Sequence, residues 1–169
     1  MPAFIKGMAL CEGFFHDCAK PILTARFPGL PYSAGLIGYG SDVLGYDDAV
    51  STDHMWGPRF YLFLREEDIG RKAEIMEAFA EGLPYTYKGY SVNFSAPDPN
   101  DNGVRHAEPV TEGKVSPLIF IETFEEFLIE QLGRPDLHRI GPFEWLAFSE
   151  HRLLTLVSGK FFADGVGCA

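Results

Sequence analysis

Two apolar runs, separated by a Gly-Ser turn and an acidic residue, constrain the fold of this chain more than any other feature. The first run, Leu36 to Tyr39, ends in Gly40-Ser41, and Asp53 precedes a second run that begins at Trp56. Residues 42–52 lie between the turn and the acid, which is enough chain for a short helix and a return strand. We therefore expect backbone N–H groups, a hydroxyl and a carboxylate to meet in one small cleft that suits phosphate and metal.

The residues around Asp53 provide only half of a paired metal site. Carboxylates at positions i and i+2 of a strand point to the same face and can hold Mg²⁺ together. Here the second position is Met55, and a thioether is a soft, weak ligand for this ion. His54 would project from the opposite face of the strand. We expect Asp53 to be a metal ligand and Met55 to weaken the site.

Length and charge restrict the class of protein. The chain has 169 residues, a formal net charge of −10 and 46% hydrophobic residues, which is typical of one globular domain over 1–169. The acidic charge argues against a nucleic-acid partner, because proteins that follow phosphate backbones need a basic surface. The sequence has neither a membrane-length apolar run nor a secretory signal, so we expect a cytoplasmic protein with no membrane partner. Residues 159–169 are expected to form a flexible tail.

Apolar periodicity predicts an α/β or α+β fold, with a mixed sheet of three to five strands and flanking helices on one face. Helices are expected over 4–27 with an interruption at Pro21, and over 66–82, 123–133 and 142–157; strands are expected over 32–39, 56–64, 89–94 and 118–122. Thr123 and Glu126 have the spacing of a capping box. Residues 95–116 are rich in Pro, Asn, Asp and Gly and are expected to form a long connection.

A further indication comes from segments spread along nearly the whole chain: 12–16, 27–30, 37–41, 45–47, 51–59 and 145–148. These segments resemble the polymerase-beta-like nucleotidyltransferase superfamily, and more closely an uncharacterised bacterial branch of it, a domain of unknown function. Members of that branch usually have Asp where Met55 stands, and they usually continue into a helical region beyond the position where this sequence stops. The resemblance implies a nucleotidyltransferase-like mixed sheet.

The resemblance also implies roles for particular residues. Gly40 and Ser41 would hold the nucleotide phosphates, and Asp53 would be a catalytic metal ligand. A third carboxylate from a later strand would act as base toward the attacking hydroxyl, and both Glu108 and Glu122 are candidates. From the residues alone, an Asp after Ser-Thr is also an ordinary turn former.

Arg59 has two interpretations that the sequence leaves open. It can reach a triphosphate as part of the nucleotide site, or it can pair with one of the 24 acidic residues.

Two functions follow. The first is an enzyme that uses Mg²⁺ to transfer a nucleoside monophosphate from ATP or another nucleoside triphosphate to a hydroxyl of a small molecule or protein. The missing carboxylate at Met55 would weaken or abolish its activity. The second is a non-catalytic descendant of the fold that binds a nucleotide or a protein. Apolar side chains also cluster near the end of the sequence, and they predict a homodimer with the last helix in its interface: Trp145, Leu146, Leu153, Leu154, Leu156, Phe161 and Phe162.

Overall fold

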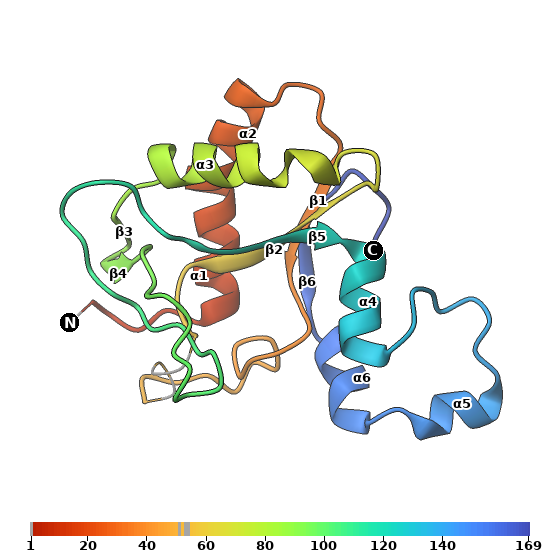
Figure 1. Cartoon of the computed structure of the whole chain (residues 1–169). Helices are drawn as coiled ribbons and strands as arrows, with labels where there is room; N and C mark the ends of the chain where they lie inside the picture. The colour runs from red at the N-terminus through yellow and green to blue at the C-terminus, as the bar shows by residue number, and fades with distance from the viewer. Residues whose placement is uncertain (1, 51, 53–54) are drawn as a thin grey trace.

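A four-stranded mixed sheet lies at the centre of the fold (Figure 1). The computed structural model describes residues 2–50, 52 and 55–169. The strand order is β5-β2-β1-β6, in which β2 runs parallel to β5 and antiparallel to β1, and β1 runs antiparallel to β6. The bounds are β1 Tyr32–Leu36, β2 Arg59–Leu64, β5 Leu118–Thr123 and β6 Lys160–Asp164. The predicted mixed α and β fold class is therefore confirmed.

Helices cover both faces of this sheet, so the expectation of helices on one face is wrong. The first face packs against α1 (Gly7–Phe14), α2 (Lys20–Arg26) and α3 (Lys72–Gly82), and the second packs against α4 (Phe124–Leu132) and α6 (Glu150–Val157) (Figure 1). The cause is visible in β2, where every residue is buried. Phe60 and Leu62 belong to the α1–α3 cluster, whereas Tyr61 and Phe63 belong to the α4 cluster. A strand that is apolar at successive positions needs cover on both sides.

The first helical segment is interrupted where the sequence predicts. A π-helical turn, Phe15–Ala19, separates α1 from α2 and lies directly before Pro21. Proline has no N–H to continue the helical ladder, and its ring crowds the preceding turn, so the chain widens there. The predicted helix 66–82 begins later, with a 3₁₀ turn at Ile69–Arg71 before α3. Among the described residues, no helix combines the length and the apolar character needed to cross a membrane.

The strands that flank the predicted cleft are shorter than expected. β1 ends at Leu36, and β2 begins only at Arg59, directly after Pro58, which agrees with proline marking a strand start. Met55 has a φ of 49° and lies in a bend before β2. The prediction that positions 53 and 55 share one strand face is therefore wrong for Met55, and Asp53 lies outside the described residues.

The middle of the chain contains little regular structure. A small hairpin of β3 (Thr86–Tyr87) and β4 (Tyr90–Ser91) replaces the strand expected over 89–94. The connection 95–116 is irregular, as expected. Arg105 donates to the carbonyl oxygen of Ser95 within it at 2.8 Å and to that of Phe94, just before it, at 3.4 Å.

The C-terminal part combines confirmed and corrected expectations. The capping box of Thr123 and Glu126 opens α4, as predicted. The helix expected over 142–157 breaks near Phe148 into α5 (Pro142–Ala147) and α6. Residues 160–164 form β6 rather than part of a flexible tail. Phe161 packs with the α4 cluster and Phe162 with the α1 cluster, so this strand completes the sheet on both faces.

Candidate functional site

The loop after β1 owes its shape to glycines. Gly38 and Gly40 have φ values of +94° and +111°, which side chains rarely adopt. A Cβ atom on Gly40 would lie 2.2 Å from Oδ1 of Asp42 and 2.5 Å from Nη2 of Arg59, so no side chain fits there. Within the described residues, the backbone N–H groups of Gly40 and Ser41 donate no hydrogen bond. In the described part of the chain, these two donors at the predicted phosphate position therefore have no acceptor.

A buried ion pair holds this loop against β2. Arg59 Nη2 donates to Asp42 Oδ1 at 2.7 Å, and the two side chains are only 2% and 1% exposed. The same nitrogen donates to the carbonyl oxygen of Tyr39 at 3.1 Å, and the guanidinium lies 4.4 Å from the centre of the Tyr39 ring. Burial is the largest influence on the pKa of Arg59 and lowers it, but Asp42, Tyr39 and Cys11 together outweigh burial, so the pKa rises. Of the two interpretations of Arg59, the structure shows the pairing with an acid.

A second buried carboxylate ties the same loop to the first helix. Asp47 Oδ2 accepts from the backbone N–H of Gly7 at 2.6 Å and from the indole N–H of Trp56 at 3.2 Å. A carboxylate at the beginning of α1 is also favoured by the helix dipole. Asp47 thus links the end of the loop both to the start of α1 and to Trp56, just before β2. The sequence predicted neither Asp42 nor Asp47 as an anchor, because no local pattern marks their distant partners.

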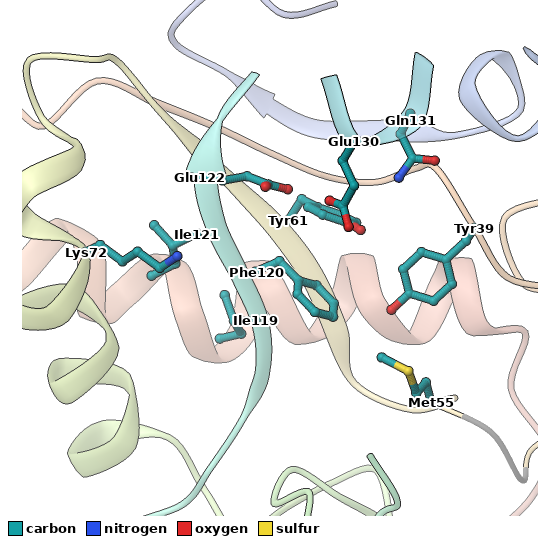
Figure 2. A pocket seen from close by; sticks show the side chains of 10 residues that line it. All are labelled: Tyr39, Met55, Tyr61, Lys72, Ile119, Phe120, Ile121, Glu122, Glu130 and Gln131. Atoms are coloured by element: carbon teal, nitrogen blue, oxygen red, sulfur yellow. The ribbon is translucent and has the colours of Figure 1, made fainter. Parts of the chain in front are cut away.

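A cavity of about 320 Å³ lies beside this loop at the β5 edge of the sheet, where residues from both faces line it (Figure 2). It brings together Tyr39 from the glycine loop, Met55 from the bend before β2, Glu122 from β5 and Glu130 from α4. Its remaining lining residues are Tyr61, Lys72, Ile119, Phe120, Ile121 and Gln131. The residue that stands in place of the second predicted metal ligand therefore shares a cavity with one of the two candidate bases.

The other candidate base lies elsewhere. Glu108 belongs to the 95–116 connection and lines a different hollow with Ser95 and His106. Its backbone N–H donates to the carbonyl oxygen of Asn93 at 3.0 Å, which fixes it in that connection. Of the two carboxylates, only Glu122 is placed in the cavity beside the glycine loop.

The ionisation of Glu122 is strongly perturbed. Burial, followed by the charges of Glu130 and Glu126, raises the pKa of Glu122 to about 7, and Lys72 offsets only part of the rise. Such a carboxylate exchanges its proton near neutral pH, which suits a general acid or base.

Aromatic rings line the same cavity. The ring centres of Tyr61 and Phe120 lie 4.9 Å apart in a stacked arrangement, and Tyr39 meets Phe120 edge-on at 6.3 Å. Burial raises the pKa of both tyrosines, so their hydroxyls stay protonated. The hydroxyl oxygen of Tyr39 is buried and has no hydrogen-bond partner among the described residues. It is therefore available to a ligand.

The described residues do not fit a resident Mg²⁺ ion. No group of three or more His, Cys, Asp or Glu side chains is arranged to hold a metal anywhere in the part of the chain that the structure describes. In the cavity, the oxygen donors are the carboxylates of Glu122 and Glu130 and the amide of Gln131, and Met55 contributes sulfur. Mg²⁺ prefers six oxygens in a near-ideal octahedron. The predicted ligand Asp53 lies outside the described residues.

Glu130 and Tyr61 are site residues that sequence reasoning missed. The capping box at Thr123 makes the turn between β5 and α4 tight, so α4 folds back along β5. This turn is the one local signal that could have placed Glu130 opposite Glu122. Comparisons of the chain with protein-family models, curated proteins and solved structures found no match.

Proposed function

We propose that this chain is a nucleotidyltransferase-fold protein that binds ATP or another nucleoside triphosphate at the Gly40–Ser41 turn and has weak transfer activity. The acceptor hydroxyl would lie in the adjoining cavity. One observation carries the proposal: Tyr39 belongs to the glycine loop and also lines the cavity that contains Met55 and Glu122. The proposed phosphate site and the proposed proton acceptor, Glu122, therefore adjoin one cavity. The sequence resemblance of segments 37–41 and 51–59 supports the same conclusion.

The proposed reaction is a phosphoryl-group substitution. The acceptor oxygen forms a bond to the α-phosphorus of the nucleotide, the bond from that phosphorus to the bridging oxygen breaks, and pyrophosphate leaves. The hydroxyl proton passes to the carboxylate of Glu122, whose pKa of about 7 leaves it able to accept one at neutral pH. The open N–H groups of Gly40 and Ser41 would hold phosphate oxygens.

The expected weakness of the transfer reaction follows from incomplete neutralisation of the phosphate charge. Reactions of this class depend mainly on positioning and on neutralising phosphate charge, a role that Mg²⁺ usually fills. Met55 places a thioether at the cavity where relatives of the resembled family usually have a carboxylate. Any Mg²⁺ would therefore arrive with the nucleotide, and a rate loss of several orders of magnitude is expected.

Met55 also favours a second candidate, the non-catalytic descendant of the fold. In that case the chain would bind a nucleotide or a protein partner without transferring a group. The two candidates differ in what they require of the metal, and calorimetry separates them.

The test is titration with ATP in the presence and absence of Mg²⁺, followed by an assay with α-labelled ATP. Saturable binding that requires Mg²⁺ and a slow release of pyrophosphate support the enzyme. Binding that ignores Mg²⁺ supports the descendant, and no binding defeats both nucleotide proposals. Ser41→Ala should weaken binding by about tenfold, since a hydrogen bond to a charged group contributes roughly 1.5–3 kcal/mol. Ser149→Ala, at the exposed start of α6, removes a hydroxyl that makes no capping hydrogen bond; it is the matched control and should leave affinity unchanged.

A further inference from the structure

We propose that the cavity beside Glu122 binds the ammonium group of an organic ligand. Glu122 and Glu130 both line this cavity, and Figure 2 shows their carboxylates directed toward the same hollow from β5 and α4. Within the described part of the chain, neither carboxylate has a hydrogen-bond or ion-pair partner. Two acidic groups brought together in this way repel each other, and a cation placed between them would relieve that repulsion.

The remaining lining selects the kind of cation. Tyr61 and Phe120 present stacked rings beside the carboxylates, and Tyr39 adds a third ring and a buried hydroxyl without a partner among the residues described. An ammonium group is attracted to aromatic faces and donates several hydrogen bonds, which carboxylate and hydroxyl oxygens accept.

A divalent metal ion suits the cavity less well. The carboxylates of Glu122 and Glu130 and the amide of Gln131 fall short of the six oxygens that Mg²⁺ prefers, and no cluster of three ligating side chains occurs among the described residues. Lys72, the lysine that lines the cavity, does not occupy the proposed ammonium position either. Lys72 lines the cavity and lowers the pKa of Glu122 slightly, yet it makes no ion pair with Glu122 or Glu130 in the described structure.

The volume of about 320 Å³ lies at the small end of ligand cavities, so the ligand is small, or only its ammonium end enters. The inference rests on the proposed function in one respect: the ligand would be the acceptor, with its hydroxyl near Glu122. Binding of the ammonium group itself does not depend on any nucleotide.

Binding should depend on pH through Glu122. The charged and titratable groups near it are Glu126 and Glu130 on α4, Lys72 on α3, Tyr61 on β2 and Tyr39 in the glycine loop. Because the pKa of Glu122 is about 7, its carboxylate is mostly protonated at pH 6 and mostly ionised at pH 8. An alkylammonium stays charged throughout this range. Affinity should therefore rise by about tenfold from pH 6 to pH 8.

The probe is 1,4-diaminobutane, titrated calorimetrically into the full chain without nucleotide, with 1,4-butanediol as the uncharged control. We expect saturable binding of the diamine only. Glu122→Gln and Glu130→Gln should each weaken it by at least tenfold. Glu125→Gln removes the same charge from an exposed position of α4 outside the cavity and should change affinity less than twofold.

Equal binding of diamine and diol, no saturation, or no effect of either cavity variant would overturn the inference. So would MgCl₂ alone binding at these carboxylates while the diamine fails to compete. If a Gln variant does not fold, the diol comparison and the pH series on the wild-type chain decide the matter. Diamine binding without ATP binding would defeat the nucleotide proposal alone, and ATP binding without diamine binding would defeat this inference alone.

Discussion

Replacing Asp42 by Asn should destabilise the protein severely. The substitution keeps the size of the side chain but removes the charge 2.7 Å from Arg59, and the two side chains are 1% and 2% exposed. Removing one partner of a buried ion pair typically costs about 3–5 kcal/mol, because the other charge stays buried without compensation. Domains of this kind have total stabilities of roughly 5–15 kcal/mol. We therefore expect Tm to fall by about 6–20 °C, at 2–4 °C for each kcal/mol.

The assay is urea unfolding followed by tryptophan fluorescence, since Trp56 is buried and bonded to Asp47 next to the loop. Glu81→Gln is the control: it removes the same charge from exposed pairs with Arg26 and Lys114 and should change the stability little. Adding Arg59→Met to Asp42→Asn removes both charges and should recover much of the loss. A loss below about 1 kcal/mol for Asp42→Asn would refute the claim that this pair holds the loop.

Three further predictions concern the cavity and the surface. The pKa of Glu122 is raised from 4.5 to about 7 by folding, so its contribution to stability is full below pH 4.5 and is lost as the pH rises through 7. The full pKa shift corresponds to roughly 3 kcal/mol, and the partial exposure of Glu122 reduces this value. In urea unfolding, Glu122→Gln should therefore stabilise the protein by about 1–2 kcal/mol at pH 8 and hardly at pH 4. Equal effects at the two pH values would contradict the prediction. Met55→Asp should strengthen Mg²⁺-ATP binding about tenfold in calorimetry, since Asp tolerates a φ of 49° better than Met and adds a carboxylate to the cavity that Glu122 lines, whereas Met55→Leu should have no effect. The homodimer stays a prediction, and Phe143 and Leu146, which are 86% and 81% exposed, are available for its interface. In sedimentation experiments, glutamate at either position should convert the dimer to a monomer. A wild-type chain that sediments as a monomer at micromolar concentration would rule the dimer out.

Local sequence rules predicted the parts of the fold that depend on neighbouring residues. Thr123 and Glu126 bond to each other's backbone within one turn, so their spacing alone fixes the start of α4. Pro58 marks the beginning of β2 for a similarly local reason. The strand at residues 160–164 depends instead on pairing with β1, which lies far away in the sequence, so no local pattern distinguished it from a flexible tail.

The same distinction applies to the site. Gly40 was predicted correctly as a turn glycine, because its freedom of φ is a property of the residue itself. The choice of Glu122 over Glu108 required the sheet order, which the sequence does not contain. The left-handed φ of Met55 was not predictable from a pattern that resembles a strand, and it removed the argument that positions 53 and 55 share a face.

The central claim is that a nucleotide occupies the place where the glycine loop meets the cavity, and the methionine methyl groups can test it directly. Met55 lines the cavity, whereas Met76 on α3 packs against the cluster on the other face of the sheet. In NMR spectra of protein with labelled methionine methyl groups, titration with Mg²⁺-ATP should shift the Met55 signal saturably and leave the Met76 signal in place. A Met55 signal that does not move while calorimetry records saturable ATP binding would place the nucleotide elsewhere and contradict the account.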